Sequence, residues 1–225
     1  MPSNKIQLVI FDLDGVLTET STYHFQAWKA LAKDFGVDLD DAFETQLKGV
    51  SRAESLERIL KAHHLENVFS EDEKQTLLDK KNTHYQSLIS HMTKDHLFDG
   101  VIDCFHYLKD QNVNIALGSA SKNAPALINA LEIQPYIDYV VDPRGLASKP
   151  APDIFLDAMH HFGVTSNACI GIEDAYAGIT AINQAGMISI GIGDKKELPH
   201  ADYCYPSIKA IPLTVIDALL KGVTP

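Results

Sequence analysis

Cysteine is scarce in this chain, which has three in 225 residues. Cys104, Cys169 and Cys204 are odd in number, and their spacing matches no zinc-binding pattern. This count excludes a disulfide framework of the kind that stabilises small secreted domains. Since all three cysteines lie in apolar stretches, we expect reduced, buried thiols, as in a cytoplasmic protein.

Long hydrophobic runs and an excess of basic residues are also lacking. No apolar stretch approaches the ~18 residues of a membrane helix, and residues 1–5 lead into a strand-like segment without a signal-peptide pattern. Lys and Arg total 19 against 30 Asp and Glu, a net charge of −11. An acidic surface disfavours nucleic acid and anionic membranes. With no long exposed apolar stripe, we expect a cytoplasmic monomer that binds neither nucleic acid nor membrane.

Hydrophobic residues make up 45% of the chain, which suffices for one large core with a smaller insert. Short apolar runs bounded by polar residues or glycine are typical of parallel strands that are buried on both faces. Such runs occupy residues 6–11, 114–118, 168–172 and 188–192, with a shorter one at 139–141. Helical stretches between them cover residues 100–111, 123–131, 152–162 and 175–185. This alternation predicts an α/β fold with a parallel sheet covered by helices on both sides.

The interval from residue 20 to residue 96 breaks this alternation. Apolar residues recur at helical spacing in 25–35, 53–61 and 71–89, and no strand-like run occurs between them. Turn-forming residues mark both edges of the interval. We therefore expect a helical domain over residues 19–96, inserted into a core domain formed by residues 1–18 and 97–225.

Polar side chains follow the predicted strands at the point where each strand ends. Asp12 and Asp14 follow the first strand, and Glu173 and Asp174 follow the fourth. Other candidates at strand or loop ends are Ser119, Ser121, Lys122, Asn123 and Lys149. Because the carboxyl ends of parallel strands meet at one edge of a sheet, we expect these residues to share one site.

The residue types in this group indicate phosphoryl chemistry. The carboxylates of Asp12, Glu173 and Asp174 form a set of hard oxygen ligands suited to Mg²⁺. The cation and Lys149 would neutralise charge on a phosphoryl group. Asp12 is then the candidate nucleophile, and Asp14 the candidate acid/base. A lone D-x-D pair is more often a turn, and Glu173-Asp174 alone is more often a helix cap. Only their joint occurrence favours the shared site.

Four motifs resemble those of the haloacid dehalogenase superfamily, in the same order and over nearly the whole chain. They are F-D-L-D-G-V-L at 11–17, Ser119 after its strand, S-K-P-A-P-D-I-F at 148–155 and I-G-I-E-D-A-Y-A-G-I at 170–179. The resemblance implies a Rossmann-like core, a helical cap domain, bound Mg²⁺ and an aspartyl phosphate. It implies the catalytic residues Asp12, Asp14, Ser119 and Lys149. The implied metal ligands are Asp12, Asp14 through its backbone carbonyl, Glu173 and Asp174.

Three further stretches resemble the β-phosphoglucomutases within that superfamily. They are T-x-x-Y-H-F-x-A-W-K-A-L-A at 20–32, Q-L-K-G-V-S-R at 46–52 and S-A-S-K-N at 119–123. The resemblance implies a Mg²⁺-dependent isomerase that interconverts β-D-glucose 1-phosphate and D-glucose 6-phosphate through a β-glucose 1,6-bisphosphate intermediate. It implies these substrate-binding residues: Thr20, His24, Lys48, Gly49, Val50, Arg52, Lys81, Ser121, Lys122 and Asn123.

The same resemblance distributes roles among these residues. Arg52 grips the phosphate that is not being transferred, and residues 121–123 contact the same phosphate from the core. Residues 48–50 contact the sugar or help the cap close, whereas Thr20 and His24 lie at the cap hinge near Asp14. Lys81 faces the site from the cap. The chain departs from the family at Glu19, where aspartate is common, and we expect no change in the reaction.

Two alternatives stay open. A phosphatase of small sugar phosphates would use the same fold and pass the phosphoryl group to water. A sensor that only binds a sugar phosphate would need no nucleophile, so the joint presence of Asp12, Asp14, Ser119, Lys149 and Asp174 argues against it.

Overall fold

A six-stranded parallel sheet forms the centre of the molecule in the computed structural model, which describes residues 5–222. The strands lie in the order β3-β2-β1-β4-β5-β6. Their bounds are β1 Leu8–Phe11, β2 Asn114–Leu117, β3 Tyr139–Val140, β4 Cys169–Glu173, β5 Ile188–Ile192 and β6 Tyr203–Tyr205. Since β1 lies between β2 and β4, a crevice is expected at the carboxyl end of β1. The α/β class predicted from the sequence is confirmed.

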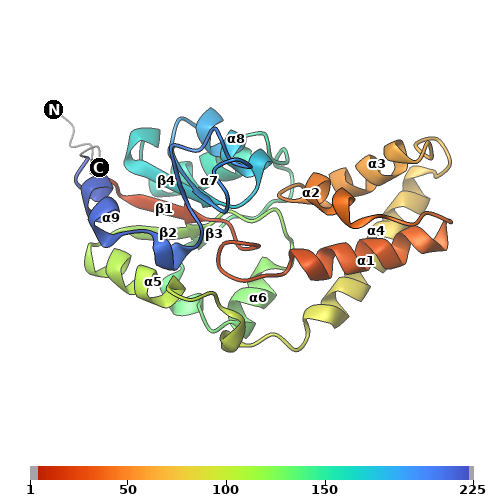
Figure 1. Cartoon of the computed structure of the whole chain (residues 1–225), viewed down its shortest axis with the longest axis horizontal. Coiled ribbons are helices and arrows are strands. Elements are labelled where there is room, and N and C mark those ends of the chain that lie inside the picture. The colour runs from red at the N-terminus through yellow and green to blue at the C-terminus, as the bar shows by residue number, and fades with distance from the viewer. Residues whose placement is uncertain (1–4, 223–225) are drawn as a thin grey trace.

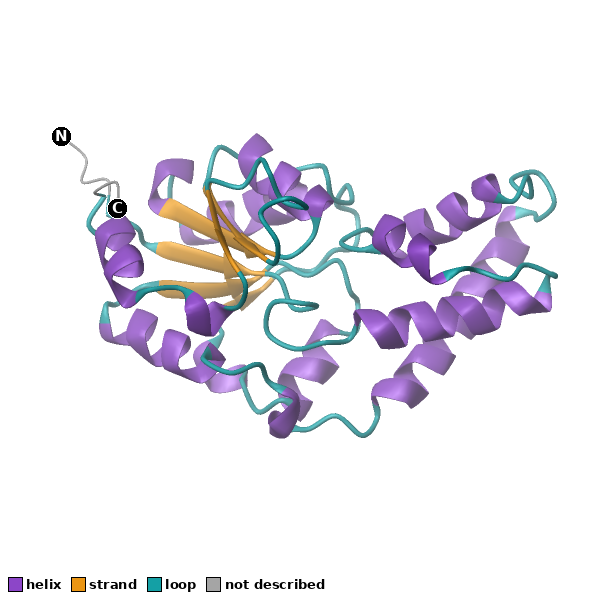
Figure 2. Ribbon diagram, viewed as in Figure 1, coloured by secondary structure: helices purple, strands orange, loops and turns teal. Residues whose placement is uncertain are grey.

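Helices cover both faces of this sheet (Figure 2). Strand β1 is apolar on both sides: Val9 and Phe11 join one hydrophobic cluster, whereas Leu8 and Ile10 join another. The first cluster includes residues of α5 (Val101–Asp110), α6 (Ala124–Ala130) and α9 (Leu213–Leu220). The second includes residues of α7 (Asp153–Phe162) and α8 (Tyr176–Gln184). A central strand that is buried on both faces explains the unbroken apolar run before Asp12.

The four helices before α5 stand apart from the sheet (Figure 1). They are α1 Ser21–Asp34, α2 Glu44–Leu47, α3 Arg52–Ala62 and α4 Glu71–Ile89, and we call them the cap helices. They enclose an apolar cluster of their own that includes Trp28, Leu31 and Ile59. The segments that enter and leave them pair at Thr18 and Leu97. A separate cluster supports the proposal of a cap domain, whose bounds at 19 and 96 stay a prediction.

Most predicted elements lie within one or two residues of their observed bounds, and β5 and α4 match them. Helix α1 begins four residues earlier than expected. Strand β6 and helices α2 and α9 were not predicted, since each is short and lacks a long apolar pattern. Short 3₁₀ helices also occur in the described residues at Asp41–Phe43, Lys94–His96, Gln134–Tyr136, Ser166–Ala168 and Ile208–Ala210.

The prediction for cysteine was partly wrong. Cys104 and Cys169 are free and buried, but Cys204 is only half-buried. It lies on β6, one of the two edge strands, which is paired on one side only. The ends of the predicted core domain, residues 1–4 and 223–225, lie outside the described residues. Among residues 5–222 no helix is both long enough and apolar enough to cross a membrane.

Candidate active site

A cavity of about 300 Å³ lies between the carboxyl edge of the sheet and the cap helices. Its size falls at the lower end of small-molecule sites, at roughly 300 Å³. The structure brings most of the predicted site residues to its wall. These are Asp12, Asp14, His24, Lys48, Gly49, Val50, Arg52, Lys81, Ser119, Ser121, Lys122, Asn123 and Asp174. Thr20, Lys149 and Glu173 do not line the cavity, and all three are buried.

Asp12 stands at the end of β1 with its carboxylate held from two sides. The Asp12 backbone N–H still donates to Ile172 in β4, so the sheet fixes its position. Its Oδ2 accepts a hydrogen bond from the backbone N–H of Asp14 at 2.9 Å. Its Oδ1 accepts one from Lys149 Nζ at 2.6 Å. The side chain is therefore oriented before any substrate binds, as a nucleophile requires.

Lys149 forms a buried charge bridge between Asp12 and Glu173. Its ammonium lies 2.6 Å from Asp12 Oδ1 and 2.7 Å from Glu173 Oε1. The other oxygen of Glu173 accepts the backbone N–H of Ala175 at 2.7 Å. Burial lowers the pKa of Lys149, but the two carboxylates more than offset it and raise that pKa. Lys149 is thus held positively charged next to Asp12.

Burial and the crowding of carboxylates at this edge disfavour the charged forms of Asp14 and Asp174. Burial, followed by the charges of Asp12 and Glu19, raises the pKa of Asp14 to about 8. Burial, followed by the charges of Glu173 and Asp12, raises the pKa of Asp174 well above its usual range. Lys48 reaches Asp174 only at 3.7 Å. The Oδ1 atom of Asp14 is buried without a hydrogen-bond partner in the described structure.

These observations fit a divalent cation with hard oxygen ligands. Asp174 packs against the loop after β1, since a Cβ at Gly15 would lie 2.1 Å from its Oδ2. No group of three His, Cys, Asp or Glu side chains within residues 5–222 is already arranged as a metal site. The predicted set, however, takes one ligand from the Asp14 backbone carbonyl. Glu173 differs from Asp12, Asp14 and Asp174 because it does not line the cavity and is 0% exposed. Its carboxylate contacts Lys149 and Ala175 instead.

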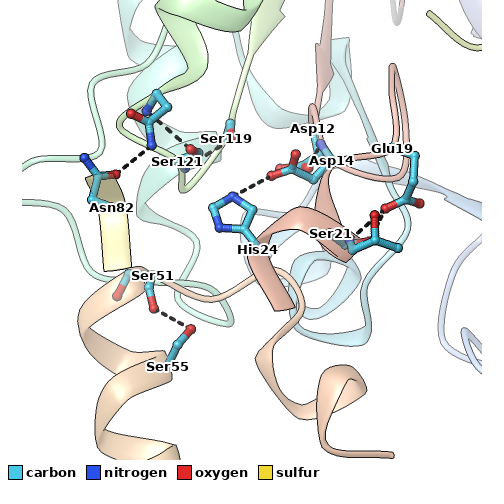
Figure 3. Close-up of polar contacts among 12 residues, drawn as sticks. Asp12, Asp14, Glu19, Ser21, His24, Ser51, Ser55, Asn82, Ser119 and Ser121 are labelled. Carbon is cyan, nitrogen blue, oxygen red and sulfur yellow. Dashed lines mark hydrogen bonds and ion pairs between the residues drawn. The ribbon is translucent and has the colours of Figure 1, made fainter. Parts of the chain in front are cut away.

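A chain of polar contacts runs from the cap to Asp14. Lys81 is 1% exposed, and its Nζ lies 2.6 Å from His24 Nδ1 and 4.9 Å from the ring centres of Trp28 and Tyr85. Burial, followed by Lys81 and Arg52, holds the pKa of His24 well below its usual range, so the ring is neutral. With Nδ1 accepting from Lys81, the ring proton is on Nε2. That atom faces Asp14 Oδ2 at 3.9 Å (Figure 3).

The groups expected to bind the second phosphate enter the cavity from both sides. Arg52 is the first residue of α3, is half-buried, and donates from Nη1 to the backbone oxygen of Leu78 at 3.2 Å. On the core side, the loop after β2 is held by its own hydroxyls. The backbone N–H of Ser121 donates to Ser119 Oγ at 3.1 Å, and that of Asn123 donates to Ser121 Oγ at 3.3 Å.

Asn82 and Arg144 also line the cavity but were missed in the sequence analysis. Asn82 follows Lys81 on α4, and Figure 3 shows it directed toward the loop that carries Ser119 and Ser121. Helical spacing was a usable signal for it, because Leu78, Asn82 and Tyr85 fall on one face of α4. Arg144 lies in an irregular loop and pairs with Asp142, and no pattern in the sequence marks it.

The described fold and site define a class of protein. The chain belongs to the haloacid dehalogenase-like hydrolase family, whose model matches residues 6–186. Within it, the chain is similar to the β-phosphoglucomutases, as the sequence motifs indicated. It is 44% identical over 198 residues to the β-phosphoglucomutase of Bacillus subtilis, with 88% of each chain covered. It matches the crystal structure of a β-phosphoglucomutase from Clostridium difficile with a TM-score of 0.93 and 40% identity, covering 96% of this chain and 98% of that one.

A more distant relative is named as a phosphatase. The phosphorylated carbohydrates phosphatase of Thermotoga maritima is 25% identical over 185 residues, with 81% of this chain and 82% of the relative covered. The resemblance predicted from the motifs is confirmed, and the higher identity is to the mutase.

Proposed function

We propose that this chain is a β-phosphoglucomutase, which interconverts β-D-glucose 1-phosphate and D-glucose 6-phosphate. One observation carries the proposal: a single cavity holds the oriented carboxylate of Asp12 and the cations of Arg52 and Lys122. A mutase needs two phosphate subsites, because its intermediate is a bisphosphate. The identity to β-phosphoglucomutases from Bacillus subtilis and Clostridium difficile supports the same reading. A sugar-phosphate phosphatase is the second candidate. The Thermotoga phosphatase supports it, but at 25% identity against 44% for the Bacillus mutase.

The reaction uses Asp12 as phosphoryl carrier and Asp14 as proton carrier. O6 of glucose 1-phosphate attacks the phosphorus on Asp12, so that the O6–P bond forms and the Asp12–P bond breaks. Asp14 takes the O6 proton. The bisphosphate then turns around, Asp12 attacks the phosphorus on O1, and Asp14 returns the proton to O1. Each step is a balanced phosphoryl transfer, and Lys149 stabilises the charge on Asp12 when the group leaves.

We propose that Arg52, Lys122 and the loop residues Ser121 and Asn123 hold the phosphate that is not being transferred. A guanidinium binds phosphate through two hydrogen bonds and suits this role. Ser119 lines the same cavity as Asp12. Lys48, Gly49 and Val50 form the cap loop opposite, where Gly49 approaches Ala175 so closely that a Cβ would lie 2.9 Å from it.

We further propose that Mg²⁺ is held by the carboxylates of Asp12 and Asp174 and the backbone carbonyl of Asp14. When bound, it neutralises negative charge on the transferred phosphoryl group. Glu173 contributes to this site by holding Lys149 beside Asp12. Thr20 and His24 sit where α1 leaves the core, so that the surroundings of Asp14 depend on the position of the cap.

Replacing Arg52 tests the second phosphate subsite. Arg52→Ala is expected to raise KM for β-glucose 1-phosphate by about 10- to 100-fold. This range corresponds to the binding free energy contributed by a hydrogen bond to a charged group. The melting temperature should not change, because Arg52 makes one backbone contact. Lys61→Ala is the matched control: it removes an exposed cation from the same helix at a position that does not line the cavity. Wild-type kinetics for Arg52→Ala would refute the assigned contact.

Replacing Asp14 tests the proton carrier. Asp14→Asn keeps the shape but exchanges no proton, so kcat should fall by about 10²- to 10⁴-fold. Phosphate transfer to the sugar and loss of phosphate to water should slow together, as rapid-quench measurements with labelled phosphoenzyme would show. If only one of the two rates fell, Asp14 would not serve both reactions.

The products separate the two candidate functions. The protein is given anomerically pure β-glucose 1-phosphate, a trace of the 1,6-bisphosphate and Mg²⁺, and glucose 6-phosphate and inorganic phosphate are measured. Glucose 6-phosphate in large excess supports the mutase, whereas phosphate without glucose 6-phosphate identifies a phosphatase. That the protein is a monomer in the cytoplasm stays a prediction.

A further inference from the structure

The cap and core are joined by side-chain amides at one edge of the cavity. Asn82 and Gln86 lie four residues apart on the same face of α4, and Asn123 immediately precedes α6 in the core. Asn123 Nδ2 donates to Asn82 Oδ1 at 2.9 Å. Gln86 Nε2 donates to Asn123 Oδ1 at 3.0 Å. We call these three residues the amide clamp.

The clamp differs from other polar contacts between the cap helices and the core. His24 approaches Asp14 at 3.9 Å and Lys48 approaches Asp174 at 3.7 Å. Both distances are too long for hydrogen bonds, and both cap residues approach active-site carboxylates. The two clamp contacts are hydrogen bonds of ordinary length, made by uncharged groups. They also use both polar ends of the Asn123 amide, so only one register of α4 satisfies them.

The position of the clamp connects it to the second phosphate subsite. Asn123 belongs to the loop that also carries Ser121 and Lys122, whereas α4 supplies Leu78, whose carbonyl accepts from Arg52. A shift of α4 against this loop would therefore separate Arg52 from Lys122. Closing the same edge also keeps water away from the phosphorylated aspartate.

We propose that Asn82 and Gln86 are positioning residues, which hold the cap closed over the core loop during phosphoryl transfer. This inference rests on the proposed mutase function. Neither residue touches the reacting atoms, and both act through Asn123. Without the clamp, the cap opens over the core loop more often. Water then reaches the phosphoenzyme and removes its phosphate, and the second phosphate binds less tightly.

Gln86 is the residue to change, because it is exposed and its side chain forms no part of the cavity wall. Gln86→Met keeps the size but removes the donor. One hydrogen bond is worth roughly a fivefold change in the closing equilibrium. We therefore expect the ratio of inorganic phosphate to glucose 6-phosphate to rise about fivefold, with KM rising more than kcat falls. The melting temperature should stay at the wild-type value.

Two variants serve as controls. Gln86→Lys restores a donor to Asn123 Oδ1 and should return the product ratio toward the wild-type value. Gln111→Met makes the same chemical change at an exposed position at the end of α5, away from the cavity, and should behave as wild type. A lower melting temperature for Gln86→Met with an unchanged product ratio would show a merely structural role and overturn the proposal.

The outcome is separable from that of the proposed function. If the wild type forms glucose 6-phosphate and Gln86→Met gives the same product ratio, the clamp fails and the mutase stands. If the wild type releases only phosphate, the proposed mutase function is wrong. Small-angle X-ray scattering then tests the clamp separately. A larger radius of gyration for Gln86→Met than for the wild type and Gln111→Met would support it, and equal radii would overturn it.

Discussion

Asp12→Ala is expected to abolish turnover, with kcat falling by about 10⁴-fold or more. The reason is that the phosphoryl group then has no carrier, and the remaining groups can only bind the substrate. The fold should survive, because Lys149 keeps its bond to Glu173. Stopped assays with coupled detection of glucose 6-phosphate measure the rate, and circular dichroism confirms the fold.

Asp110→Ala provides the matched control for this change. Asp110 is an exposed residue at the end of α5, shortly before the amino end of β2, whereas Asp12 follows the carboxyl end of the parallel strand β1. It should leave kcat unchanged. Residual isomerisation by Asp12→Ala at a tenth of the wild-type rate would mean that another group carries the phosphate, and the assignment of Asp12 would fall.

Lys149→Met is expected to reduce the free energy of unfolding by about 3–5 kcal/mol, because it leaves two buried carboxylates without their cation. Asp12 and Glu173 are 5% and 0% exposed, so solvent compensates little for the lost ammonium. Activity should fall as well, since Lys149 orients the Asp12 carboxylate. Urea denaturation followed by fluorescence measures the stability change.

A second variant and a surface control separate the charge effect from simple misfolding. Lys149→Met combined with Glu173→Gln removes one uncompensated charge and should recover part of the lost stability. Lys109→Met breaks the pair with Asp138, which is partly exposed, and should cost about 1 kcal/mol or less. If Lys149→Met cost no more than Lys109→Met, the buried charge bridge would not stabilise the core.

The sheet and most of its helices could be predicted from the sequence because buried parallel strands leave unbroken apolar runs. Both faces of β1 are covered, so its residues from Leu8 to Phe11 show no polar alternation. Strand β6 escaped prediction because it lies at a sheet edge, with three half-buried residues and no β-branched residue. The other edge strand, β3, was marked by Val140 and the buried Val141. Edge strands receive less burial, so their sequences carry a weaker signal.

Site residues that belong to a motif at the end of a strand were predicted. Those that only tertiary packing brings to the cavity were missed. Asp12 and Asp174 follow strands, so the sheet geometry brings them together. Helical spacing places Asn82 on one face of α4 with Leu78 and Tyr85, but the sequence does not show that this face approaches the loop before α6. The sequence also did not show that the Glu173 carboxylate accepts a hydrogen bond from Lys149. That contact is buried and joins segments that are distant in the sequence.

The most direct test of the account is to trap the phosphorylated protein during turnover and locate the phosphate. Wild-type protein is mixed with β-glucose 1,6-bisphosphate and Mg²⁺, quenched in acid within milliseconds and analysed by peptide mass spectrometry. The account predicts one phosphoryl group on Asp12, formed and lost as fast as glucose 6-phosphate appears. A phosphoryl group on another residue, or isomerisation with Asp12 unmodified throughout, would contradict it.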